Sequence, residues 1–165
     1  MSSSTERHQS VSVELLFQLK LFLRGKTTPH VYHAPFDVRL NHKTKDNIAV
    51  QPDILVICDP EKIKNGKSCI GAPDLAIEIL SDSSTQGHDK VLKLNLYQTA
   101  GVREYWIVHH TTGIVEVYIL ENGKYHITPY SKVDTIPVHT LEGCEIDLKE
   151  VFIDEELPKE IRIKQ

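Results

Sequence analysis

Two acidic residues set in apolar, strand-like segments are the part of this sequence best suited to chemistry. Asp53 opens the run Ile54-Leu55-Val56-Ile57, and Glu78 lies within the run Leu75-Ala76-Ile77-Glu78-Ile79-Leu80. Burying a carboxylate among apolar side chains costs free energy unless the carboxylate is paired or binds a metal ion. If the two segments are neighbouring strands, facing side chains lie about 5 Å apart. The pair Asp53 and Glu78 is therefore the first candidate for a metal site.

A second Pro-Asp pair, Pro73-Asp74, has a different interpretation. Asp74 and Glu78 lie four residues apart on one predicted strand, which separates their side chains by roughly 13 Å. The ligands of Mg²⁺ lie about 2.1 Å from the ion, so these two carboxylates cannot share one ion directly. An aspartate that follows a proline at a strand entrance commonly accepts hydrogen bonds from turn backbone. We expect Asp74 to be mainly structural.

The segment after the Glu78 strand carries a lysine in an apolar setting. At about 100° per residue, Lys93 falls in the middle of an apolar helical face. That face is formed by Leu92, Leu94, Leu96, Tyr97 and Ala100. A lysine so placed either extends to solvent or pairs with a buried anion. Asp89, Lys93 and Tyr97 share one side of the helix, Lys90 is the substitute candidate for the lysine, and Asp89 has a helix N-cap as its alternative role.

These residue types together suit metal-assisted hydrolysis of a phosphodiester. Two carboxylates can hold Mg²⁺, or Mn²⁺ as a substitute, and such an ion polarises the phosphate and lowers the pKa of an attacking water. A nearby lysine, Lys93, could position that water or stabilise charge on the phosphoryl oxygens. Gln51 precedes Asp53 by two residues on the same predicted face and could orient a water or a phosphate.

The predicted elements place these candidates on a sheet flanked by helices. From the N-terminus they are a helix over 11–24, strands over 31–40, 50–58 and 74–80, a turn and capping stretch over 81–87, a helix over 89–100, strands over 104–108, 113–120 and 125–129, and a short strand and turn in the tail. A capping box of Ser3 and Glu6 would start the first helix earlier, and Asn122-Gly123 predicts a hairpin turn. Near-continuous apolar runs at 50–58 and 74–80 are typical of strands covered on both faces. The order predicts an α/β or α+β fold with a central mixed sheet.

Composition is that of a soluble globular protein. The 165 residues are 40% hydrophobic and 25% charged, which suits one domain with its own core. No apolar run reaches the roughly 18 residues that cross a bilayer, and Met1–His8 lacks the layout of a secretory signal. An odd number of cysteines without metal spacing (Cys58, Cys69 and Cys144) predicts reduced thiols in the cytoplasm. The net charge of −4 argues against a general polyanion binder, but not against a nuclease.

Histidine pairs in the sequence do not predict a zinc site. His30 with His33 and His109 with His110 come without cysteine or carboxylate partners at zinc-ligand spacing. We expect these histidines to lie on strands or on the surface.

With its motifs taken together, the chain resembles a known family. The motifs are Gln51-Pro52-Asp53-Ile54, the run from 73 to 81, Asp89 with Lys93 and Tyr97, and Gly101-Val102-Arg103-Glu104-Tyr105-Trp106-Ile107-Val108. They are similar to those of the Uma-two family of restriction-endonuclease-like proteins, within the PD-(D/E)xK nuclease superfamily, over about residues 8–152. The resemblance implies a single restriction-endonuclease-like domain across residues 1–165, with a central mixed sheet flanked by helices.

The same resemblance implies roles for individual residues. The superfamily's Pro-Asp acid matches Asp53, and its second acid matches Glu78. The superfamily's lysine position holds Leu80 here, and the lysine of the following helix, Lys93, matches the place to which this family moves it. The acid of the first helix has Glu14 as its nearest match. Mg²⁺-dependent cleavage of DNA is implied, and a homodimer is a possible assembly because superfamily nucleases are often dimers.

Two alternatives to the nuclease hypothesis stay open. A nuclease fold kept as a non-catalytic binding or interaction module is favoured by the acidic net charge and by the short segment before the first core helix. A plain structural subunit would have its acids bonded to backbone groups. The leading prediction is a cytoplasmic, Mg²⁺-dependent endodeoxyribonuclease that uses Asp53, Glu78 and Lys93.

Overall fold

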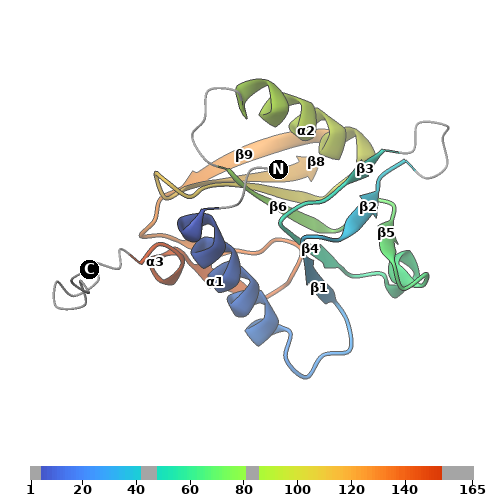
Figure 1. The fold of residues 1–165 in the computed structure, drawn as a ribbon, viewed down its shortest axis with the longest axis horizontal. Coiled ribbons are helices and arrows are strands. Elements are labelled where there is room, and N and C mark those ends of the chain that lie inside the picture. The colour runs from blue at the N-terminus through green and yellow to red at the C-terminus, as the bar shows by residue number, and fades with distance from the viewer. Residues whose placement is uncertain (1–4, 42–47, 81–85, 154–165) are drawn as a thin grey trace, which may run out of the picture.

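A six-stranded mixed sheet forms the centre of the protein in a computed structural model that describes residues 5–41, 48–80 and 86–153 (Figure 1). The strand order is β1-β4-β6-β7-β8-β9. These strands are β1 (His30–His33), β4 (Ile54–Ile57), β6 (Leu75–Leu80), β7 (Glu104–His109), β8 (Ile114–Glu121) and β9 (Lys124–Tyr130). The neighbours β6 and β7 run parallel, and the other neighbours run antiparallel. The predicted mixed sheet is confirmed.

One face of this sheet is covered by α1 (Glu6–Phe22). Val11, Leu15 and Leu19 are buried against strand residues that include Ile77. The C-terminal elements complete the same core: β10 (Thr135–Pro137), β11 (Glu145–Asp147) and α3 (Leu148–Val151). The helix begins five residues before the predicted start, because Thr5 caps it by accepting a hydrogen bond from the backbone N–H of His8.

The other face is covered by α2 (Gln86–Ala100) and by a small second sheet (Figure 1). The second sheet has the order β3-β2-β5, with β2 (Asp37–Arg39), β3 (Ala49–Val50) and β5 (Ser68–Ile70), and a short 3-10 helix, η1 (Pro60–Ile63), precedes β5. Val38, Leu55 and Tyr97 meet in the core between the layers. Strands β4 and β6 are therefore enclosed from both sides, as their apolar runs predict.

Two predicted strands are each divided in the structure. The prediction over 31–40 becomes β1 and β2, and the prediction over 50–58 becomes β3 and β4, in different sheets. A proline interrupts each segment, Pro35 in the first and Pro52 in the second. Proline cannot donate a hydrogen bond to a strand ladder, so the chain changes sheets at these points. The interruption at Pro52 leaves Asp53 at the entrance of β4.

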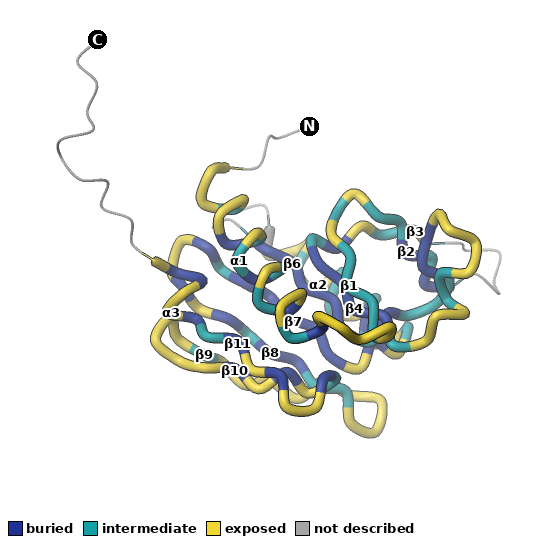
Figure 2. Tube along the Cα trace, turned by 90° about the horizontal axis from the view of Figure 1, so that it is seen from below, coloured by how far each residue is buried: buried dark blue, intermediate teal, exposed yellow. Residues whose placement is uncertain are grey.

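The remaining elements predicted between residues 89 and 129 agree with the structure within a few residues, whereas the tail, predicted to hold one short strand and a turn, forms β10, β11 and α3. Asn122 and Gly123 both have positive φ angles, of 51° and 78°, as the predicted hairpin turn between β8 and β9 requires. The proposed contribution of Ser3 to a capping box lies outside the described residues, as does most of the predicted capping stretch over 81–87. Figure 2 shows the central strands as a buried layer between exposed loops. Among the described helices, none is both long and apolar enough to span a membrane.

Candidate active site

The sheet register brings Asp53 and Glu78 side by side. Ile54 is paired with Ile77 in the antiparallel ladder of β4 and β6, so the next position along the ladder sets Asp53 opposite Glu78. The backbone N–H of Ile79 donates a 2.7 Å hydrogen bond to Asp53 Oδ2. This bond fixes the Asp53 carboxylate beside the Glu78 backbone, and the adjacency expected from the sequence is present.

Glu78 is a buried carboxylate with a partner on each oxygen. Its exposed fraction is 4%. The Tyr97 hydroxyl donates a 2.9 Å hydrogen bond to Oε1, and Lys93 Nζ lies 3.3 Å from Oε2. Burial, joined by the nearby charge of Asp53, raises the pKa of Glu78 to about 7 although Lys93 and Tyr97 act in the opposite direction. Burial also raises the pKa of Tyr97, so its hydroxyl stays a donor.

Helix α2 presents two lysines that contact different acids. Lys93 contacts Glu78, and its Nζ also lies 3.8 Å from Asp89 Oδ2. Lys90 Nζ lies 2.6 Å from Glu116 Oε2 instead. The geometry therefore pairs Lys93, and not Lys90, with the buried acid of β6.

The predicted details of α2 need two corrections. The helix begins at Gln86, so Asp89 lies inside its first turn and is not its N-cap. Leu92 was expected on the buried face, but it is 54% exposed. Tyr97 is fully buried, because the C-terminal half of the helix approaches the sheet closely enough to pack on it.

A further carboxylate, Glu116 on β8, was not predicted from the sequence and lies two strands away from Glu78. Glu78 is paired with Ile107 on β7, and Ile107 is paired with Glu116 on β8. Glu116 contacts both Lys90 and His109, the latter at 3.1 Å. Burial alone would raise the pKa of Glu116, but the hydrogen bonds from Lys90 and His109 outweigh it and lower that pKa. The signal in the sequence was an acid between Val115 and Val117, in a strand whose other residues from Ile114 to Leu120 are all apolar.

Gln51 and Glu14, two proposed supporting residues, have their own partners elsewhere. Gln51 Nε2 donates a 2.7 Å hydrogen bond to Asp37 Oδ1 on β2. Glu14 Oε1 accepts a 3.1 Å hydrogen bond from Gln18, one turn further along α1. Neither contact directs these side chains to Asp53 or Glu78.

Asp74 has the structural role expected for it. One of its oxygens accepts a 2.6 Å hydrogen bond from the backbone N–H of Cys58, and the other lies 2.8 Å from Arg103 Nη2. The carboxylate thus ties the entrance of β6 to the end of β4.

Glu104 shows how a buried acid is stabilised without any ion. It is 0% exposed. It accepts hydrogen bonds from the indole N–H of Trp106 and from the backbone N–H groups of His139 and Thr140. Three donors satisfy this carboxylate, whereas Glu78 shares its surroundings with a second acid, and that difference marks Glu78 as the functional candidate.

Helix α1 contributes a residue that was not predicted. His8 Nε2 lies 3.4 Å from Asp53 Oδ1, and the side chain is 18% exposed. The sequence reasoning weighed histidines only as zinc-spaced pairs. Since the contact joins residues 45 positions apart, no local pattern could have revealed it.

The donor set at Asp53 and Glu78 fits a hard divalent cation. Carboxylate oxygens are the ligands that Mg²⁺ and Mn²⁺ prefer, and Mg²⁺ is often held by one or two carboxylates with waters and substrate phosphates. A cation would also relieve the proximity of two carboxylates, one of them buried. In the described parts of the chain, no three His, Cys, Asp or Glu side chains form a ready metal cage. The arrangement therefore fits a partly open site better than a closed structural one.

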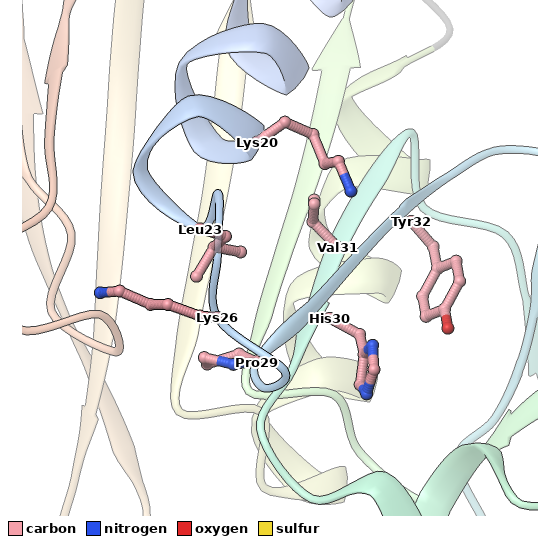
Figure 3. A pocket seen from close by; sticks show the side chains of 7 residues that line it. All are labelled: Lys20, Leu23, Lys26, Pro29, His30, Val31 and Tyr32. Atoms are coloured by element: carbon pink, nitrogen blue, oxygen red, sulfur yellow. The ribbon is translucent and has the colours of Figure 1, made fainter.

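A basic pocket elsewhere on the protein is separate from this site (Figure 3). It measures about 180 Å³ and is lined by Lys20, Leu23, Lys26, Pro29, His30, Val31 and Tyr32. Lys20 is twelve residues after His8 on α1, a rise of roughly 18 Å along the helix. In Figure 3 the amino groups of Lys20 and Lys26 point in different directions. These cations do not converge on one ligand.

Comparisons with known proteins show the family and the fold of this chain. The family model Uma2, described as "Putative restriction endonuclease", matches residues 1–149. A solved structure from Anabaena variabilis, described as a putative nuclease belonging to DUF820, superposes with a TM-score of 0.70 at 19% identity, covering 92% of this chain and 83% of that one. No curated protein matches the chain. The structural similarity shows the shared fold, and the family match over most of the sequence shows that this chain belongs to the Uma2 family of restriction-endonuclease-like proteins.

Proposed function

We propose that this protein is a metal-dependent endonuclease that hydrolyses DNA phosphodiester bonds at Asp53 and Glu78. The observation that carries the proposal is the pairing of a buried Glu78 with Asp53 across neighbouring strands, with Lys93 at 3.3 Å from Glu78. Membership of a nuclease-like family supports the same reaction class. Mg²⁺ is the proposed cofactor, with Mn²⁺ as a substitute.

Each site residue has a part in the proposed reaction. Asp53 and Glu78 would hold the cation, which when bound supplies Lewis-acid polarisation of the phosphate and a lower pKa for an attacking water. Lys93 presents its ammonium group beside Glu78, where it can orient the water or contact a phosphoryl oxygen. Tyr97 holds Glu78 Oε1 and so fixes the direction of the carboxylate. Asp89, 3.8 Å from Lys93, keeps the lysine on this side of α2.

A cleavage assay tests this proposal. Purified protein with Mg²⁺ or Mn²⁺ should nick supercoiled plasmid DNA, and Asp53→Ala and Glu78→Ala should each abolish the nicking. Running single-stranded RNA beside the plasmid tests the choice of DNA. Equal activity in the wild type and in both variants rejects the assignment, because a contaminating nuclease behaves in that way.

A non-catalytic binding module is the second candidate function. It is favoured by the fact that Tyr97 and Lys93 already contact both oxygens of Glu78, which leaves the acid compensated without an ion. Calorimetry with Mn²⁺ separates the two candidates. Binding that requires Asp53 supports the nuclease, and no heat of binding up to millimolar Mn²⁺ supports the module.

The proposal extends to the setting in which the protein acts. We place it in the cytoplasm, because Cys58, Cys69 and Cys144 are free thiols and a reducing compartment keeps them so. A homodimer is proposed as its assembly. Sedimentation equilibrium gives the mass in solution, for which the dimer predicts twice the 18.8 kDa of one chain.

A further inference from the structure

The first turn of α1 carries His8 to the rim of the candidate site. Thr5 fixes the start of the helix, since its hydroxyl accepts a 3.2 Å hydrogen bond from the backbone N–H of His8. From there the imidazole approaches the entrance of β4, and Nε2 lies 3.4 Å from Asp53 Oδ1. The contact joins α1, on one face of the sheet, to Asp53. Glu78, the proposed partner of Asp53 in metal binding, faces α2.

The orientation of the imidazole is constrained on more than one side. The ring of His110 packs edge-on against it, with centroids 6.0 Å apart and planes at 78°. His8 Nδ1 is buried and has no hydrogen-bond partner among the described residues. A buried N–H without a partner costs more than a buried lone pair without one, since unsatisfied donors are the rarer case. The favoured tautomer therefore has its proton on Nε2, directed at Asp53.

The Asp53 carboxylate has a nitrogen neighbour at each of its oxygens. The backbone N–H of Ile79 donates to Oδ2 at 2.7 Å, and His8 Nε2 faces Oδ1. Each oxygen has a further lone pair for another ligand. A separation of 3.4 Å is longer than the roughly 2.7–3.2 Å of an N–H···O bond, and such contacts at active sites often shorten only in the loaded complex.

Direct ligation by His8 fits the site less well than an indirect role. Mg²⁺ and Mn²⁺ favour oxygen ligands, whereas imidazole is better suited to zinc, copper or nickel. Among the described residues, no three His, Cys, Asp or Glu side chains form a ready metal cage, so Asp53, Glu78 and His8 do not form one either. Carboxylate ligands of metals are commonly held in place by hydrogen bonds from neighbouring groups.

We propose that His8 is a positioning residue, which holds Asp53 Oδ1 so that this carboxylate and Glu78 are directed at the same divalent ion. The inference rests on the proposed metal site and extends it, because a residue of α1 then holds the ligand Asp53 in place. Loss of such a support typically weakens metal binding by about 10- to 100-fold.

Calorimetric titration of the full chain with Mn²⁺ tests this role. His8→Ala is expected to weaken binding by about 10- to 100-fold. His8→Gln should recover most of the loss, because its amide nitrogen occupies nearly the position of Nε2 and donates a hydrogen bond. His126→Ala, at a side chain that is 66% exposed, is the matched control and should bind as the wild type does. Unchanged affinity in His8→Ala overturns the inference.

Recovery of affinity in His8→Gln is the readout that a purely structural role would not give, and spin-echo electron paramagnetic resonance of bound Mn²⁺ separates a positioning residue from a direct ligand. A positioning residue predicts no directly bound nitrogen in the wild type, and strong nitrogen coupling that disappears in His8→Gln would make His8 a ligand and overturn the role. If His8→Ala fails to fold, the wild type and His8→Gln decide the question through this signal and their affinities. If Mn²⁺ binding is lost in Asp53→Asn but unchanged in the His8 variants, the inference about His8 is overturned and the metal site stands. If Mn²⁺ binding is unchanged when Asp53 or Glu78 is replaced, the metal site itself is overturned.

Discussion

The backbone N–H of Ile79 donates a 2.7 Å hydrogen bond to Asp53 Oδ2, which ties the acid at the entrance of β4 to the residue that follows Glu78 on β6. The position of one carboxylate therefore depends on the strand that carries the other. A shift of one residue in the pairing of β4 and β6 would turn Asp53 to the opposite face of the sheet. The adjacency of Asp53 and Glu78 is thus a direct consequence of strand register.

Two substitutions of Asp53 distinguish the role of its negative charge from the role of its hydrogen bond. Asp53→Asn keeps an oxygen that can accept from Ile79, so the folded structure should persist while metal binding and cleavage are lost. Asp53→Ala removes the acceptor as well, and its free energy of unfolding should fall by about 1–3 kcal/mol. Chemical denaturation measures the stability of both variants, and Mn²⁺ calorimetry measures their binding. Tight Mn²⁺ binding by Asp53→Asn would contradict the assignment of this residue.

Removing the hydroxyl of Tyr97 should affect Glu78 specifically. The hydroxyl donates a 2.9 Å hydrogen bond to Oε1 and lowers the pKa of that acid, so Tyr97→Phe should raise the pKa of Glu78 further. It should also destabilise the protein by about 1–3 kcal/mol, since a buried acceptor loses its partner. Tyr32→Phe serves as the control, because the Tyr32 ring stacks on Phe36 and keeps that contact. Similar unfolding midpoints for the two variants would argue against the role of Tyr97.

The raised pKa of Glu78 predicts how stability and metal binding depend on pH. In the absence of metal, the folded protein binds the Glu78 proton more tightly than the unfolded chain does, because burial raises this pKa from 4.5 to about 7. The free energy of unfolding should therefore fall as the pH rises from 4.5 to 7, by about 3 kcal/mol from this group. Metal binding must displace the proton, so Mn²⁺ affinity should rise up to tenfold per pH unit below 7 and level off above it.

Glu78→Gln is the control for this pH dependence. Denaturation at pH 5 and at pH 8 should show the loss of stability in the wild type, and a smaller loss in the variant. The same change in both proteins would assign the effect to other groups.

The two lysines of α2 should differ in what they support. Lys93→Met removes the ammonium group at Glu78 and should reduce cleavage by about 100-fold or more, with Mn²⁺ binding largely kept. Lys90→Met removes the partner of Glu116 and should lower stability more than cleavage. Turnover and unfolding measured on both variants test the distinction. A greater loss of cleavage in Lys90→Met would reverse the assignment.

Asp74 should prove to be important for stability alone. Asp74→Ala leaves the backbone N–H of Cys58 without its 2.6 Å partner and breaks the contact with Arg103, at an expected loss of about 1–3 kcal/mol. Mn²⁺ affinity should stay at the wild-type value under conditions where the variant is folded. A metal-binding defect in folded Asp74→Ala would return the second Pro-Asp pair to the active site.

The sequence was sufficient to predict the acids and the sheet that carries them. Continuous apolar runs predicted that β4 and β6 are enclosed, and the cost of burying charge singled out Asp53 and Glu78. Strand geometry then separated Asp74 from them. The helical periodicity of α2 likewise placed Lys93 and Tyr97 on the side of Glu78, where both contact it.

What the sequence did not predict depends on contacts between distant segments. His8 reaches Asp53 only because α1 packs across the sheet, and Glu116 pairs with Lys90 only because β8 lies two strands from β6. Gln51 was expected at the site from its spacing to Asp53, but the chain changes sheets between them and Gln51 bonds Asp37. Local periodicity carries no information about such crossings.

The most direct test of the central claim is the cleavage of supercoiled plasmid as a function of Mn²⁺ concentration, compared between the wild type and Glu78→Gln. The variant keeps the shape of the side chain and an oxygen that can accept from Tyr97, and loses only the charge that would bind the ion. We predict saturable, Mn²⁺-dependent nicking by the wild type and none by Glu78→Gln. Nicking by the variant at the wild-type rate and with the same Mn²⁺ dependence would contradict a metal site at Asp53 and Glu78.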